Sequence, residues 1–300
     1  MWFKNLRVFR LAPEWSILPD ALEQALAGQA FQPCASQDAE SLGWVAPRSD
    51  DPLVHAVGKQ YLLCLRAERR LLPASVVRQA ADQRADELEE QQGYRPGRRQ
   101  MRELREEMTQ TLLPQAFRIH QDTRIWLDLE HHWLVIDAAA AARADAVMGL
   151  LADALQPLPA QPLELARSPA AAMTAWLLED NPPDGFTIDQ EAELRAADDS
   201  KATVRYVRHD LDAEELGRHI ATGKQCTRLA LTWADRISFV LTDAMELRRI
   251  SPLDILDEGS EASDTANEDE RFDADFSLMS AELAVLLDAL VAALNETGGK

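Results

Sequence analysis

The sequence predicts an α+β protein with antiparallel sheets, and three observations favour this class. Strand-like runs rich in branched and aromatic side chains follow one another across short turns, at residues 123–138 and 226–250. Segments with apolar residues at helical spacing stand between these groups of strands, as at 98–112. The strict alternation of strand and helix that is typical of parallel sheets is missing from this pattern. We therefore expect helices packed beside hairpins and meanders.

Composition limits the kind of partner that the protein binds. The 300 residues carry 31 basic and 51 acidic side chains, a net charge of −20, which argues against a surface that coats nucleic acid or anionic membrane throughout. A basic groove remains compatible with this charge, because salt screens charges beyond about 10 Å. The N-terminal residues contain no signal-peptide core, and no 18-residue apolar run occurs. We expect a cytoplasmic protein without membrane contact.

Three widely spaced cysteines, Cys34, Cys64 and Cys226, form no metal-binding spacing. An odd number of cysteines in a cytoplasmic protein is typical of reduced thiols, which are usually buried. We therefore expect free, buried cysteines.

The first predicted part is a central body formed by residues 1–74 and 122–160. It opens with a strand at 2–11, which Pro13 ends. The other elements predicted for this body are a helix at 19–28, a short strand at 43–45, one or two strands at 61–66 and 69–72, a hairpin at 123–138 with its turn at 130–132, and a helix at 139–155.

Residues 75–121 are predicted to form a projecting helical arm. Two helices, at 75–90 and 98–112, are separated by Gly93, Pro96 and Gly97. Both are strongly charged and carry only a thin apolar stripe, which is typical of helices that pack on one side.

Residues 161–300 are predicted to form a second part after a proline-rich boundary at 156–169. Its predicted elements are a helix at 170–180, strands after 185 and at 202–211, a helix at 212–224, a meander at 226–250, an acidic loop at 253–275 and a helix at 277–294.

A basic island at residues 95–105 stands out in this acidic chain. It contains a single acid, Glu103, and five arginines, Arg95, Arg98, Arg99, Arg102 and Arg105. Arginine offers a two-pronged donor to phosphate, so the island predicts contact with a nucleic-acid backbone. The alternative is a solvated helix face. A second and weaker basic patch groups Lys224 with Arg205, Arg208, His209 and Arg228.

Phe117 follows Pro114 among polar neighbours. Two interpretations remain open: an anchor in the core at the end of a helix, or an exposed aromatic side chain that enters a partner's pocket.

Catalytic motifs give little support to an enzyme. His131 and His132 would point to opposite faces of a strand, and no third ligand lies at motif spacing, so we predict no metal site and no cofactor. We interpret the pair as part of a turn. Asp273 and Asp275 are the residues that a metal-dependent nuclease would use, but no further ligand accompanies them at motif spacing.

Seven phrases, in order and at family spacing, resemble the RdgC family of recombination-associated proteins over essentially the whole chain. They are WFKNLRVFRL, AFQPCASQD, LGWV, LLPQAF, ATGK, TRLALTW and RFDADFSLMSAELAVLLDAL. The resemblance implies a curved protomer of several parts. It implies that two protomers close into a ring-shaped homodimer around duplex DNA, with single-stranded DNA as an alternative ligand. It also implies binding without sequence preference, antagonism of RecA, a nucleoid-associated location and no catalytic activity.

The same resemblance implies roles for particular residues. Phe117 matches a hydrophobic finger at a dimer contact. Arg208 and His209 match a basic Lys-Gln pair, so the second position departs from the family, and Lys224 matches the lysine of a Gly-Lys pair. The arm's DNA-binding role falls loosely on Arg95, Arg98 and Arg99. The alternatives are a nuclease that uses Asp273 and Asp275, or an acidic module that engages RecA directly through residues 254–275.

Overall fold

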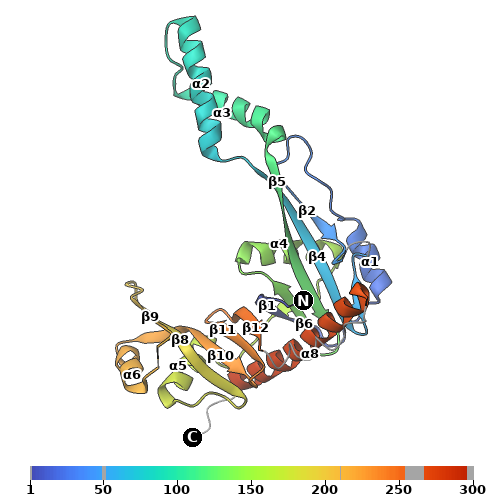
Figure 1. Cartoon of the computed structure of the whole chain (residues 1–300), viewed down its shortest axis with the longest axis vertical. Coiled ribbons are helices and arrows are strands. Elements are labelled where there is room, and N and C mark those ends of the chain that lie inside the picture. Colours follow the sequence, from blue (N-terminus) through green and yellow to red (C-terminus); the bar gives the residue numbers. More distant parts are fainter. Residues whose placement is uncertain (1, 49–51, 210, 254–266, 296–300) are drawn as a thin grey trace.

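The computed structural model describes residues 2–48, 52–209, 211–253 and 267–295, and Figure 1 shows an elongated, bent chain. Its strands form one twelve-stranded sheet whose main path runs β2-β4-β5-β6-β1-β12-β11-β10-β8-β9. The paired strands are antiparallel, which confirms the α+β class. β1 joins the two halves of the sheet, because it pairs with β6 on one side and β12 on the other.

The first half contains the strands β1 (Asn5–Leu11), β2 (Glu40–Val45), β3 (His55–Val57), β4 (Gln60–Leu71), β5 (Phe117–Asp128), β6 (Trp133–Asp137) and β7 (Ala160–Pro162), with the helices α1 (Pro19–Ala27) and α4 (Ala141–Ala154). Side chains alternate across the sheet. Ile125 and Leu127 of β5 therefore join the core beneath α1 and α4, whereas Trp126 joins the core on the opposite face.

The second half contains α5 (Pro169–Glu179), β8 (Phe186–Ala196), β9 (Thr203–Val207), α6 (Ala213–Ala221), β10 (Lys224–Trp233), β11 (Ile237–Thr242), β12 (Glu246–Pro252) and α8 (Glu268–Asn295). The meander predicted at 226–250 is confirmed as β10, β11 and β12. One face of these strands packs against α5, α6 and α8 in a single apolar core. The opposite face carries polar and charged side chains, among them Glu193 of β8 and Arg248 of β12.

Helix α8 corrects one prediction. The acidic loop predicted at 253–275 is wrong over its last residues, because α8 already begins at Glu268; residues 254–266 of that prediction lie outside the described residues. Three acids in the first turn, Glu268, Asp269 and Glu270, favour the helix there, because carboxylates stabilise the positive N-terminal end of a helix. By length and composition alone α8 is apolar enough to cross a membrane, but 44% of that window is buried inside the protein.

The arm is a hairpin of the helices α2 (Ala74–Gln92) and α3 (Arg98–Leu112), followed by the short 3₁₀ helix η1 (Leu113–Gln115). Gly93 ends α2 with φ +78°, a left-handed conformation that glycine adopts at little cost. Ala81 and Ala85 of α2 pack against Leu104 of α3 in a small core of their own. Small residues on α2 thus let the two helices approach closely.

Strands β4 and β5 form a stem that carries the arm (Figure 1). Residues Gln60 to Leu71 form a single strand, β4, so one strand and not two occupies the segment where one or two were predicted. β5 begins at Phe117 rather than at residue 123, and its first six residues are exposed. Exposed stretches bury no apolar face, so the alternation that reveals a half-buried strand is absent there.

Candidate nucleic-acid and subunit interfaces

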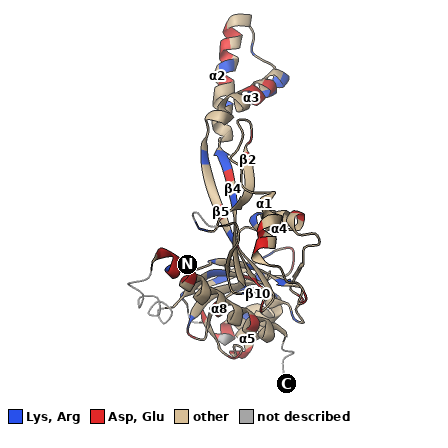
Figure 2. Ribbon diagram, turned by 90° about the vertical axis from the view of Figure 1, so that its right-hand side faces the viewer, with Lys and Arg blue, Asp and Glu red and all other residues tan. Residues whose placement is uncertain are grey.

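The arginines of the basic island lie on the arm, where acids of the same arm pair with several of them. Arg95 lies 3.6 Å from Asp86 of α2, and Arg99 lies 3.0 Å from Glu103 one turn along α3. Figure 2 shows acidic and basic residues interleaved along α2 and α3. The island is therefore partly neutralised, by Glu103 and Glu106 of α3 itself and by Asp86 of α2, which pairs with Arg95.

Arg98 and Arg105 differ from these paired arginines. Within the described ranges, no acid forms an ion pair with either of them, and both side chains are exposed. Arg98 begins α3, whereas Arg105 faces the base of the arm. These two guanidinium groups keep all their donors available for an anionic partner.

Arg70 fixes the arm to the stem. It is 6% exposed, and its guanidinium donates to four backbone carbonyl oxygens at 3.0–3.1 Å. These carbonyls belong to Ala35 and Asp38 in the loop before β2 and to Leu113 and Pro114 at the end of the arm. One buried side chain therefore ties together three segments that are distant in sequence.

Glu68, two residues earlier on β4, is the second polar group under the arm. Its carboxylate is 2% exposed and accepts hydrogen bonds from the Cys34 backbone N–H at 2.9 Å and from His120 Nε2 at 2.7 Å. Arg118 lies 3.6 Å away. The hydrogen bond from His120, followed by that from Cys34 and the charge of Arg118, lowers the pKa of Glu68 to about 2 although burial opposes this.

Phe117 is 84% exposed, so the interpretation of a core anchor is wrong. It pairs in register with Leu71, the last residue of β4, which is 47% exposed. Ile119 and Val76 are also large exposed apolar residues near this junction. We call these four residues the arm-base patch. Exposed apolar patches of this kind mark interaction surfaces.

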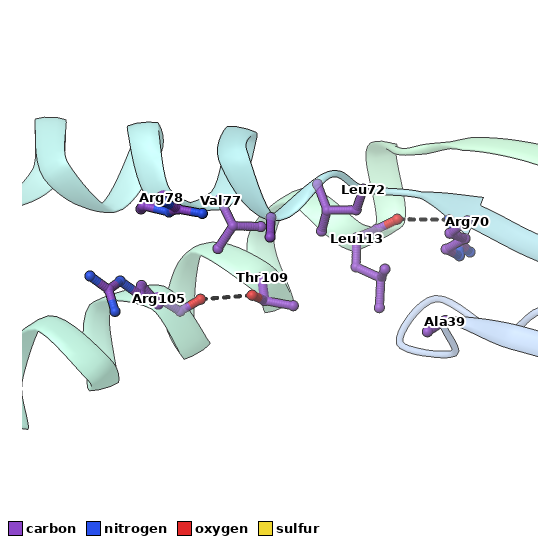
Figure 3. A pocket seen from close by; sticks show the side chains of 9 residues that line it. Ala39, Arg70, Leu72, Val77, Arg78, Arg105, Thr109 and Leu113 are labelled. Atoms are coloured by element: carbon purple, nitrogen blue, oxygen red, sulfur yellow. Dashed lines mark hydrogen bonds between the residues drawn. The ribbon is translucent and has the colours of Figure 1, made fainter. Parts of the chain in front are cut away.

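An open pocket of about 620 Å³ lies at the base of the arm (Figure 3), and its lining residues Leu72 and Val77 directly follow Leu71 and Val76 of the patch along the chain. Leu72, Val77 and Leu113 give it an apolar lining, and Arg70 stands at one end. Arg105 of α3 stands at the other end, beside Arg78 of α2. The pocket therefore combines apolar walls with a basic rim.

The structure separates Lys224 from Arg208 and His209 of the second predicted basic patch, whereas Arg205 of β9 and Arg228 of β10 lie on either side of Glu193 of β8. Lys224 begins β10 and pairs with Ala196 at one end of β8, where its Nζ donates to Thr222 Oγ1 at 3.1 Å. Arg208 follows the end of β9, beyond the pairing of Val207 with Glu191. Five residues of β8 separate the two positions, about 17 Å at the rise of a strand. His209 lies beside Arg208, with its ring 5.9 Å from that of Tyr206.

Sequence reasoning missed a regular set of ion pairs on the charged face of the second half. Three glutamates, Glu191, Glu193 and Glu246, each bridge two arginines; the six arginines are Arg7, Arg195, Arg205, Arg228, Arg248 and Arg249. A signal was present in β8, where Glu191, Glu193 and Arg195 alternate with buried apolar residues. The partners on other strands were not visible, because register and bulges decide which side chains meet.

The carboxylates considered for a nuclease do not gather. Asp273 lies 3.0 Å from His55, which is mostly buried, and both belong to the contact between α8 and β3. His131 lies in the turn after β5, as predicted, with its Nδ1 2.8 Å from the buried carboxylate of Asp128. Among the residues that the structure describes, no group of three or more histidine, cysteine or acidic side chains is placed to hold a metal ion.

The fold and these surfaces define an α+β protein that carries a basic-rimmed helical arm on a long antiparallel sheet. The chain belongs to the RdgC family: the family described as "Putative exonuclease, RdgC" matches residues 1–297. Recombination-associated protein RdgC of Bordetella parapertussis is 53% identical over 294 residues, which cover 98% of each chain. The protein of that name from Cupriavidus pinatubonensis is 55% identical, and the match covers 98% of each chain. The one from Burkholderia ambifaria is 54% identical, and the match covers 97% of this chain and 95% of the relative. The chain is thus a relative of recombination-associated proteins.

Proposed function

We propose that the protein binds duplex DNA without sequence preference, as a ring-shaped homodimer, and that it limits the access of RecA to DNA in the cytoplasm. Single-stranded DNA is the alternative ligand. The observation that carries this proposal is that the base of the arm presents both the exposed Phe117 and an open pocket with apolar walls. In a two-fold contact each subunit presents the same patch, so each Phe117 reaches the other subunit's pocket.

The shape of the chain supports a ring. The arm and the second half of the sheet both project to the same side of the stem, which leaves a concavity between them (Figure 1). Two such chains joined at the arm bases and at their opposite ends enclose a central space. The basic side chains proposed to face the DNA are Arg95, Arg98, Arg99, Arg208, His209 and Lys224.

An acidic protein that encircles DNA needs only a basic inner lining. Topology retains the DNA, so each phosphate contact can be weak while the complex persists. The contacts still release counterions, so the affinity falls as salt rises. Occupied DNA is then closed to RecA, which explains an association with recombination without any catalytic step.

The test combines the mass of the protein in solution with its retention on DNA. We expect a dimer that binds duplex DNA of any sequence, with affinity that falls as salt rises. We also expect it to stay on a circular duplex and to leave a linear duplex of equal length through its free ends. Equal retention on circles and linear DNA contradicts the ring, and an affinity constant from low to high salt contradicts the phosphate contacts.

The family description suggests a second candidate, an exonuclease. Asp273 and Asp275 are the acids that we considered for it, and Asp273 is engaged by His55. Incubation of end-labelled DNA with Mg²⁺ or Mn²⁺ decides between the candidates. Release of nucleotides that Asp273→Asn abolishes would support the exonuclease; intact DNA, or cleavage that survives this substitution, removes these residues from consideration.

A further inference from the structure

The charged face of the second half carries three Arg–Glu–Arg triads, in which each glutamate oxygen meets one arginine. Glu191 accepts from Arg205 at 3.0 Å through Oε1 and from Arg249 at 2.7 Å through Oε2. Glu193 accepts hydrogen bonds through Oε1 from Arg195 at 2.7 Å and from Thr227 Oγ1 at 3.0 Å, whereas Arg228 is a looser ion-pair partner, 3.9 Å from Oε2. Glu246 pairs with Arg7 and Arg248. The same arrangement recurs three times, and each triad has a net charge of +1.

Burial differs between the two partners in the triads. The glutamate side chains are 9–19% exposed, whereas the arginines of the two triads nearest β9 are 40–59% exposed. Carboxylates thus lie against the sheet and guanidinium groups lie above them. Each guanidinium has five N–H donors, and the carboxylate uses only one or two of them. The remaining donors of the outer arginines face solvent.

All three triads lie on the face opposite α5, α6 and α8. The neighbours of the triad residues along their strands, such as Leu194 on β8 and Leu247 on β12, point into the core beneath those helices. Arg249 of β12 reaches Glu191 of β8 across β11 and β10, above the small side chain of Ala230. Register shifts in β10 and β11 increase the twist there. The face is therefore twisted and carries more basic than acidic side chains, even with Asp189 on the same side.

We propose that this face binds the phosphodiester backbone of duplex DNA, with the triad arginines as the phosphate ligands and the triad glutamates as intramolecular competitors. Each glutamate holds its two arginines in place and cancels one of their charges, which keeps the binding weak enough for movement along DNA. None of these glutamates belongs to the residues assigned above to DNA. This inference rests on the proposed DNA binding and adds a surface and a mode of attenuation to it.

The decisive experiment measures duplex affinity against salt for the wild type, Glu191→Gln and Arg249→Gln, with fluorescently labelled DNA. Glu191→Gln frees one positive charge at the face, so we expect tighter binding and a log–log salt slope steeper by about 0.9. Arg249→Gln removes one phosphate ligand, so we expect weaker binding and a slope shallower by about 0.9.

Glu282→Gln is the matched control. Glu282 of α8 pairs with Arg236 at 2.9 Å on the side of the sheet that the helices cover. Glu282→Gln therefore changes the net charge by the same amount as Glu191→Gln and also breaks an Arg–Glu pair. We expect the wild-type slope for it. If Glu191→Gln and Glu282→Gln give the same slope, or if Arg249→Gln leaves it unchanged, the inference is wrong while the proposed function stands. If the wild type fails to bind duplex DNA, the proposed function itself fails. Thermal unfolding of each variant shows that it is folded.

Discussion

Phe117 stands directly across from Leu71 at the end of the β4–β5 ladder, and both side chains are exposed. The pair marks the point at which the stem becomes the arm, because α2 begins three residues after Leu71 and η1 ends two residues before Phe117. An aromatic side chain that is 84% exposed contributes little to folding. It is available for association instead.

The first prediction concerns this residue. Phe117→Ala should leave the unfolding free energy of the isolated subunit within about 0.5 kcal/mol of the wild type, because the ring makes few contacts within one chain. The same change should weaken dimerisation by about 2 kcal/mol, roughly 30-fold, as for an aromatic anchor. Sedimentation analysis over a range of concentrations measures this. Leu18→Ala, at a residue 75% exposed on the body, is the control and should leave dimerisation unchanged; equal effects of the two variants would refute the assignment.

The second prediction concerns the attachment of the arm. Arg70→Met should cost about 3 kcal/mol, because it leaves several buried carbonyl oxygens without donors. Arg70→Lys should recover only part of this loss, since an ammonium group does not reproduce the guanidinium geometry. Urea unfolding gives the stability, and limited proteolysis reports release of the arm.

Arg69→Met provides the control for that measurement. Arg69 is the neighbouring arginine of β4, and its exposed side chain lies 3.6 Å from the exposed Glu40. Surface ion pairs contribute little, so this variant should behave like the wild type. Similar losses in both variants would contradict the role assigned to Arg70.

The third prediction is a pH dependence. The pKa of Glu68 is lowered to about 2 in the folded protein, from an ordinary value of 4.5, chiefly by the hydrogen bond from His120. A lowered pKa stabilises the folded state fully above pH 4.5, and this contribution is lost as the pH falls from 4.5 towards 2. Glu68→Gln has no such titration. The stability gap between wild type and variant should shrink as the pH falls from 4.5 towards 2. Urea midpoints measured at several pH values below 5 check this, and a gap that widens in acid would disprove it.

The fourth prediction concerns the thiols. Cys34, Cys64 and Cys226 are free and buried, as expected from the sequence. Burial raises the pKa of Cys64 and of Cys226 to about 12, and burial followed by the hydrogen bond to Glu68 raises that of Cys34. A thiol-reactive disulfide reagent should therefore react very slowly with the native protein at pH 8 and should titrate all three thiols in urea. Fast reaction of one thiol in the native protein would show that its site opens.

Several elements were predictable because they carry a local pattern. Helix α3 was predicted at 98–112 and occupies those residues, since Met101, Leu104 and Met108 recur at helical spacing after Gly97. The hairpin turn around residues 130–132 was predictable from two alternating strands on either side of a polar segment. The start of β5 was not, because its first residues are exposed on both faces and show no alternation.

The division of the chain into a body, an arm and a second part stays a prediction. The sheet runs through β1 from the first half into the second, and α8 packs against residues from both halves. The hydrophobic clusters nevertheless separate the arm core from the rest.

By itself the sequence determined the class of fold, the helices with a clear apolar stripe and the membership of the RdgC family. These properties depend on local spacing or on the identity of residues along the chain. The tertiary structure decided that Phe117 is exposed, that Asp86 of α2 lies beside Arg95, and that the arginines of the sheet are more exposed than the glutamates with which they pair. Glu191 and Arg249 are 58 residues apart in sequence. Strand order, register and twist bring them together, and no local pattern encodes these.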